Sequence, residues 1–205
     1  MALPPLHRAA ALYLSWIGGL CGAIVLMLAE ILPFQLLFAT PGNFFACIVS
    51  VELFFILLAW PLFVPSLLKE GIAPPALLAY VAVLVLFALP LVLIGANVSS
   101  VGGASLVRSQ ALVAGLAALG AGMAARLPSA LPWYFLGVFW ISAAHPFWAF
   151  LGDQLGASAP AISVYVSPFW GAFDGRGAPA WVQTVLYGAA GLALLALPRR
   201  KAEAA

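Results

Sequence analysis

Charged side chains are scarce in this chain, and their scarcity decides its class. Of the 205 residues, only 7% are charged and 65% are hydrophobic, and the mean hydropathy is +1.14. Soluble domains carry roughly 25% charged residues, so this composition cannot cover a water-exposed surface. The chain is therefore predicted to be an integral membrane protein, and its net charge of +2 indicates no nucleic-acid partner.

Cysteine and histidine are also rare, which leaves few groups for metal or redox chemistry. The chain has two of each, and Cys21 and Cys47 lie in apolar runs where buried thiols are expected in preference to a disulfide. The sequence has no glycine-rich phosphate loop, Cys-x-x-Cys pair, His-Glu-x-x-His motif or Ser/His/Asp set. We therefore expect no enzyme activity, no metal site and no cofactor.

Long apolar runs separated by short polar turns make up most of the sequence. About 20 apolar residues cross a bilayer core of roughly 30 Å as an α-helix. The length allows about six such runs and no separate soluble domain, so the expected fold is all-α, a single polytopic transmembrane helix bundle. The predicted spans are residues 10–29, 44–68, 76–96, 104–125, 131–151 and 180–197.

Small residues and prolines predict how some of these spans pack. Pro61 and Pro65 lack backbone donors and favour a bend in the second span. The fourth span, residues 104–125, is rich in Ala and Gly and is expected to pack tightly among its neighbours. In the first span, Gly18 and Gly22 form a small-xxx-small pair that would let another helix approach closely.

The basic residues predict the orientation, because Lys and Arg are retained on the cytoplasmic side of a membrane. Arg108 and Arg176 fall outside if both termini are cytoplasmic, and the other six of the eight basic residues fall inside. The six are Arg8, Lys69, Arg126, Arg199, Arg200 and Lys201. We expect an inner-membrane protein with both ends in the cytoplasm.

Three ionisable residues lie within predicted spans, where a charge costs at least a few kcal/mol, roughly. Glu52 is either a proton or cation site, or a protonated or hydrogen-bonded group that holds helices together. Arg108 lies near a span end and is expected to extend to the interface. His145, beside Pro146, is expected to be structural, with axial ligation of a metal or haem only if another subunit supplies the partner.

An aromatic insert, residues 152–179, precedes the last span and is too polar to cross a bilayer. We expect an outer interfacial hairpin that dips into the membrane, in preference to an ordinary outer loop. Its central run is Ser167, Pro168, Phe169 and Trp170.

This order of elements resembles the permease subunit of ABC-type exporters of the six-span, type-two class. In the resemblance, Ser167, Pro168 and Phe169 match the small-Pro-aromatic run before the last span. Another short run matches the acidic-glycine start of the segment that couples to the ATPase: Lys69, Glu70 and Gly71. The resemblance implies a cytoplasmic ATPase on a separate chain and assembly as a dimer or with a second permease.

The sequence departs from that family after Gly71. Residues 72–75 lead almost at once into the third span, where the family has an amphipathic coupling helix. The alternative is a non-catalytic accessory subunit of a larger respiratory or photosynthetic membrane complex. An intramembrane enzyme is the least favoured reading, because a nucleophile and its base are missing.

Overall fold

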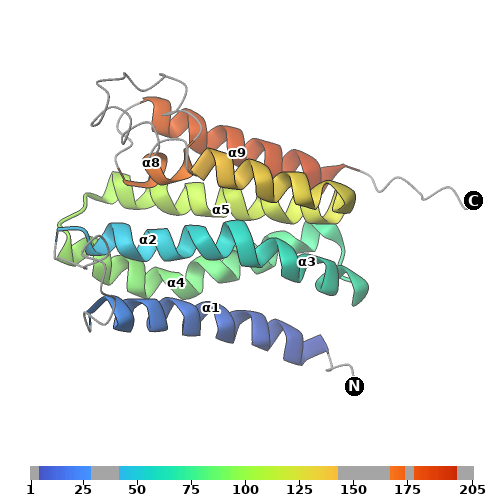
Figure 1. Ribbon diagram of the computed structural model, residues 1–205, viewed down its shortest axis with the longest axis horizontal. Helices are drawn as coiled ribbons and strands as arrows, with labels where there is room; N and C mark the ends of the chain where they lie inside the picture. Colours follow the sequence, from blue (N-terminus) through green and yellow to red (C-terminus); the bar gives the residue numbers. More distant parts are fainter. Residues whose placement is uncertain (1–4, 29–41, 143–166, 174–177, 198–205) are drawn as a thin grey trace, which may run out of the picture.

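The structure is a computed structural model, and it describes residues 5–28, 42–142, 167–173 and 178–197. These residues are helical almost throughout, and no strand occurs among them. The long helices lie side by side along one direction (Figure 1). The predicted all-α fold is confirmed for this part of the chain.

The described part of the bundle consists of long helices and several shorter elements. The long helices are α1 (Pro5–Leu28), α2 (Phe44–Phe54), α3 (Trp60–Lys69), α4 (Leu77–Val98), α5 (Gly103–Arg126) and α9 (Ala178–Ala196). The shorter elements are the π-helical turn η2 (Phe55–Ala59), the 3₁₀ turns η3 (Pro74–Ala76) and η4 (Pro128–Ala130), and α8 (Pro168–Phe173). Residues 131–142 are also helical and are drawn unlabelled and yellow-orange in Figure 1.

Four helical stretches are long and apolar enough to cross a membrane. They are Phe44–Lys69, Pro74–Val98, Gly103–Arg126 and Pro179–Ala196, and each begins and ends within a residue or two of a predicted span. Within α1 only a shorter apolar helix, Ala10–Gly22, is found. Of the fifth predicted span, residues 143–151 lie outside the described part. Membrane-spanning helices are thus supported, as four candidates where the sequence predicts six.

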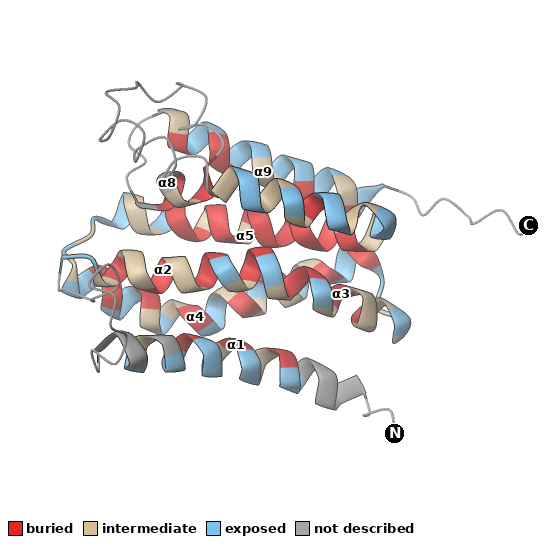
Figure 2. Cartoon of the chain, viewed as in Figure 1, coloured by how far each residue is buried: buried red, intermediate tan, exposed pale blue. Residues whose placement is uncertain are grey.

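Helix α5 is the centre of the bundle, as its predominantly buried surface shows (Figure 2). It contacts α3, α4 and α9, and its contact with α9 is the most extensive between any two described elements. A Cβ atom added at Gly115 would lie 3.0 Å from the backbone nitrogen of Gly188, and one added at Gly191 would lie 2.5 Å from that of Leu119. The tight packing predicted for residues 104–125 is therefore confirmed.

The glycine pair of the first span has no such role in the described structure. A Cβ added at Gly18 or Gly22 would meet no atom within 4 Å. The prediction that these glycines admit a neighbouring helix is wrong among the residues described, because α1 turns this face away from α2, α3 and α4, the described helices it packs against.

The prolines of the second span are accommodated by a change of helix type and by bonds from neighbours. Pro61 has no N–H group, so the carbonyl of Leu57 lacks the donor four residues later. The Tyr134 hydroxyl donates to that carbonyl at 3.2 Å, and Trp60 Nε1 donates to the Ala117 carbonyl at 2.9 Å. The irregularity therefore appears as the π-helical turn η2 just before the prolines.

Two helix ends have the same hydrogen-bond pattern but different residues at the key position. After α3, Gly71 has φ +87°, and the N–H groups of Gly71 and Ile72 donate to the carbonyls of Leu68 and Leu67. After α4, Ser100 takes the equivalent place with φ +53°. Both ends are Schellman motifs, in which glycine is preferred because a Cβ atom is disfavoured at positive φ.

Ser100→Gly is therefore expected to stabilise the protein by about 0.5–1 kcal/mol, because glycine adopts the left-handed backbone conformation without strain. The Ser100 side chain is exposed and forms no hydrogen bond to the described residues, so its removal costs little. Thermal unfolding of the purified chain in detergent measures this. The reciprocal change, Gly71→Ala, should destabilise by about 1–2 kcal/mol. A lower stability for Ser100→Gly would contradict the assignment.

The basic residues of the described helices lie at the bundle ends. Lys69 ends α3 and Arg126 ends α5, at the end of the bundle where α1 begins and α9 finishes (Figure 1). Arg126 donates from Nε to the Leu194 carbonyl at 3.2 Å and from a terminal nitrogen to that of Leu195 at 3.0 Å. A cation on the last carbonyls of α9 also interacts favourably with the helix dipole.

Candidate functional site

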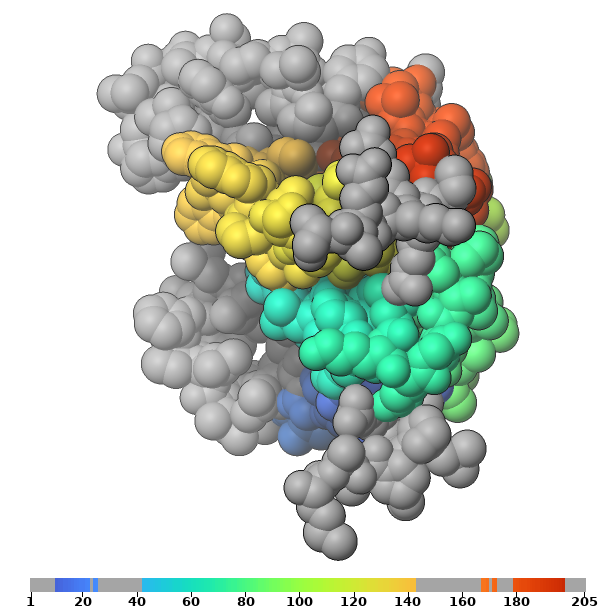
Figure 3. Space-filling view, turned by 90° about the vertical axis from the view of Figure 1, so that its right-hand side faces the viewer, coloured from blue at the N-terminus to red at the C-terminus, as the bar shows by residue number. Residues whose placement is uncertain are grey.

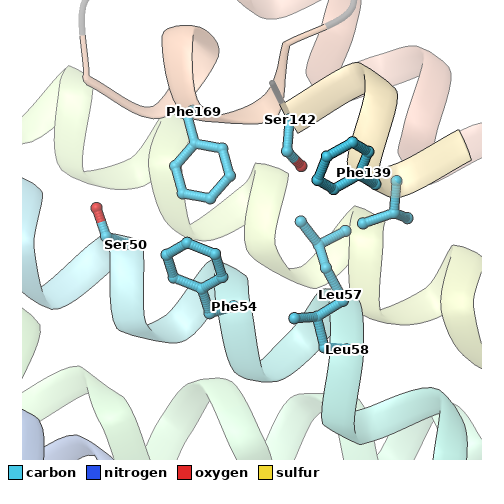
Figure 4. Close-up of a pocket in the computed structure, with 8 residues that line it drawn as sticks. Ser50, Phe54, Leu57, Leu58, Phe139, Ser142 and Phe169 are labelled. Carbon is cyan, nitrogen blue, oxygen red and sulfur yellow. The ribbon is translucent and has the colours of Figure 1, made fainter. Parts of the chain in front are cut away.

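A cavity opens on the side of the described bundle. It has a volume of about 440 Å³ and lies between α2 with η2, residues 131–142 and α8 (Figure 4). Its lining residues are Ser50, Phe54, Leu57, Leu58, Val138, Phe139, Ser142 and Phe169. Phe54, Leu58 and Phe139 are 55%, 44% and 65% exposed, so the mouth of the cavity faces the surroundings of the bundle.

Two hydroxyl groups are the only polar side-chain groups in that lining. The Ser50 hydroxyl donates to the Ala46 carbonyl at 2.8 Å, within its own helix. The Ser142 hydroxyl is buried and has no hydrogen-bond partner among the described residues. A lining with only two hydroxyl groups binds water weakly, and the cavity therefore suits an apolar molecule.

A second cavity of about 240 Å³ adjoins the first on its inner side, where α5, α9 and residues 131–142 meet. The two share Leu57, Val138 and Ser142 in their linings. Gly137 also lines the inner cavity, and a Cβ added there would meet no atom within 4 Å. Together the two cavities form an apolar recess that extends from the side of the bundle toward α5.

The short helix α8 forms one wall of the outer cavity and is fixed by buried polar contacts. The Ser167 carbonyl accepts hydrogen bonds from the Gly171 N–H at 3.1 Å and from Gln183 Nε2 at 2.8 Å. The Phe169 and Phe54 rings face each other, with centroids 5.2 Å apart (Figure 4). A Cβ at Gly171 would fall on the end of the Gln183 side chain, so an alanine there would force that amide to move.

These contacts show where the central run of the predicted hairpin lies. Ser167 and Pro168 are buried and Phe169 is half-buried, and α8 packs among α2, α5 and α9. The side chain of Trp170 and residues 152–166 lie outside the description. The described part of the run is therefore a wall of the bundle, and the hairpin as a whole stays a prediction.

The carboxyl group of Glu52 is buried in the described bundle and forms a hydrogen bond with the side-chain amide of Gln110. Gln110 Nε2 donates to Glu52 Oε2 at 2.7 Å and joins α2 to α5. Glu52 is fully buried and Gln110 is 8% exposed. The second oxygen of each side chain is buried without a partner among the described residues.

Arg108 is buried near the start of α5. Only 6% of the residue is exposed, and its Nε has no hydrogen-bond partner among the described residues. The expected extension of its side chain to the membrane interface stays a prediction.

The two cysteines are described, and they form no metal site with other described residues. Cys21 and Cys47 are both free, as predicted; Cys21, however, is exposed and Cys47 half-buried, so the prediction of buried thiols is wrong. No group of three His, Cys, Asp or Glu side chains that could hold a metal occurs in residues 5–28, 42–142, 167–173 and 178–197. His145 lies outside those ranges.

The predicted partner-contact turn lies far from the buried acid along the same continuous helix. Lys69 and Gly71 are exposed and Glu70 is half-buried, and the turn reaches the end face of the bundle beside η4 (Figure 3). The structure thus keeps the predicted polar residues apart: Glu52 inside, Arg108 toward one end, and the turn at the other.

Three functional contacts were missed from the sequence. Gln110 and Gln183 are amides within apolar helices, and such residues in a span signal an interhelical hydrogen bond. Tyr134 could have been found as the donor to the carbonyl left free by Pro61. Which residue each would meet depends on helix packing, which the one-dimensional pattern does not contain.

Comparison of the chain with known protein families, curated proteins and solved structures finds no match to any of them.

Proposed function

We propose that this chain is the membrane permease subunit of an ABC-type export system and works with an ATPase on a separate chain. The lateral cavity of about 440 Å³ is the observation that supports this best. A recess that opens sideways between membrane helices gives an apolar or amphiphilic molecule a route from the bilayer into the bundle. In this proposal the transported molecule has an apolar part that fits the recess.

The wall of the cavity has a feature suited to movement. Phe54, Leu57 and Leu58 line it from the end of α2 and from η2, directly before Pro61. π-helical turns interrupt regular helix bonding and occur frequently at functional sites. Pro61 and Pro65 remove further backbone donors, so a change in helix geometry here breaks fewer bonds than elsewhere.

The same helix connects the cavity to the proposed ATPase contact. Helices α2, η2 and α3 follow one another without a break from Phe44 to Lys69, and the Schellman motif at Gly71 fixes the turn that follows. Pro74 and Pro75 restrict the next residues. A push on Lys69 and Glu70 would therefore be carried along α3 to the cavity wall.

The test is to isolate the tagged full-length chain from its native membrane and to substitute the turn. An ATPase chain should co-purify, and Lys69→Ala with Glu70→Ala should uncouple ATP hydrolysis from export while both chains still accumulate. Ser129→Ala, an exposed change in η4 at the same end of the bundle, is the matched control and should leave coupling unchanged.

One outcome would replace the proposal. Recovery of electron-transfer or light-harvesting subunits in place of an ATPase would show that the chain is an accessory subunit of a larger membrane complex.

A further inference from the structure

The contact between Glu52 and Gln110 is chemically incomplete as a carboxylate and amide pair. Gln110 Nε2 donates to Glu52 Oε2 at 2.7 Å, but Glu52 Oε1 and Gln110 Oε1 are both buried acceptors without a partner among the described residues. A buried polar atom left without a hydrogen bond costs about 1–3 kcal/mol. A native core rarely keeps two such atoms on one hydrogen-bonded pair.

No positive charge among the described residues compensates an ionised Glu52. Gln110 is its only hydrogen-bond partner there, and no Lys or Arg forms an ion pair with it. Arg108 precedes Gln110 by two residues on α5, and side chains two apart on a helix do not share a face.

Among the described side chains, the helices packed against α2 add no other charged neighbour of Glu52. α1 and α4 contribute Tyr13 and Tyr80, whose rings stack on each other with centroids 6.3 Å apart. Helix α8 contains no ionisable residue. An uncompensated carboxylate at membrane depth is costly, so a neutral carboxyl group fits these surroundings.

We propose that Glu52 binds a proton in the folded protein and forms with Gln110 a reciprocal acid–amide pair that joins α2 to α5. The proton comes from water and resides on Oε1. The new O–H group donates to Gln110 Oε1, while Gln110 Nε2 continues to donate to Oε2. One proton thus removes the charge and supplies partners for both bare oxygens.

This assignment chooses between the two roles that the sequence leaves open for Glu52. The site takes a proton and no metal cation, and the proton is part of a contact between helices. Because α2 continues into η2 and the cavity wall, separation of α2 from α5 would expose Glu52 and allow the proton to leave. The acid–amide pair is therefore a proton-binding site that favours the packed arrangement of the bundle.

Infrared difference spectroscopy tests the proton directly. The purified full chain in lipid nanodiscs is compared with Glu52→Gln near neutral pH. The difference spectrum should contain the carbonyl stretch of a protonated carboxyl group and no carboxylate bands. In Gln110→Leu that stretch should move to higher wavenumber, because the two hydrogen bonds with Gln110 are lost. Carboxylate bands assigned to Glu52, or bands that change when sodium replaces potassium, would overturn the assignment.

Thermal unfolding of four variants provides the matched stability test. Glu52→Gln should keep the melting temperature near that of the wild type, because its amide N–H replaces the acid O–H as donor to Gln110. Glu52→Leu and Gln110→Leu should each lower the melting temperature by several degrees. The double leucine variant should melt at a higher temperature than the sum of the two single losses predicts. Equal losses in Glu52→Gln and Glu52→Leu would contradict the pair.

Neither measurement involves an ATPase. A carboxylate at Glu52 would therefore refute the proton site and leave the permease proposal to its own test.

Discussion

Gly191→Ala is expected to destabilise the protein by about 3 kcal/mol, the upper end of the range for overpacked cores. The added Cβ would lie 2.5 Å from the backbone nitrogen of Leu119 and 2.6 Å from the carbonyl carbon of Ala118. Backbone atoms cannot rotate away as a side chain can, so α9 must move off α5. For a chain of this size the loss corresponds to a fall in melting temperature of roughly 6–12 °C.

Gly188→Ala is the matched control, with the same substitution one turn earlier on α9. A Cβ at Gly188 would meet no atom within 4 Å, and alanine is favoured over glycine in a helix by about 1 kcal/mol. The control should therefore unfold at or above the wild-type temperature. Equal behaviour of the two variants would show that α5 and α9 do not meet at Gly191.

On the proposed permease function, Gly137→Phe is expected to abolish the response of the export system to its substrate while it stabilises the fold. The inner cavity of about 240 Å³ has no atom within 4 Å of the new Cβ, so the ring has room to enter. Burial of a phenylalanine side chain contributes about 1.5–3 kcal/mol. A filled recess no longer admits an apolar molecule.

The measurement is ATP hydrolysis by the purified complex with and without a total lipid extract of the native membrane. Stimulation by the extract should disappear in Gly137→Phe and persist in Leu136→Phe, which adds a ring of the same size at a neighbouring, 47% exposed position. Retained stimulation in a well-folded Gly137→Phe variant would show that the recess is not the substrate route.

The sequence predicts the helices better than it predicts their contacts. Runs of apolar residues define helix ends directly, and the candidate spans Phe44–Lys69, Pro74–Val98 and Gly103–Arg126 follow from them. The Ala and Gly content of α5 also predicts its central place, since only small side chains allow backbones to approach so closely.

The candidate site was less predictable because it depends on which faces meet. Gly18 and Gly22 have the spacing of a packing motif but contact no helix in the described structure, whereas Gly115 and Gly191 lie in the close contact between α5 and α9. The cavity is enclosed by segments that are far apart in sequence, and its shape depends on their packing. Glu52 was identified as important, but its partner Gln110 is known only from the packing of α2 against α5.

The separation of Glu52 and Gln110 along the chain has a consequence for biosynthesis. The two residues are 58 positions apart, and the ribosome adds about 5–20 residues per second. Gln110 is therefore synthesised roughly 3–12 seconds after Glu52. During that interval the Glu52 side chain on α2 has no Gln110 amide to form a hydrogen bond with. Its stable entry into the bilayer must follow the synthesis of α5, or depend on the insertion machinery to shelter it until then.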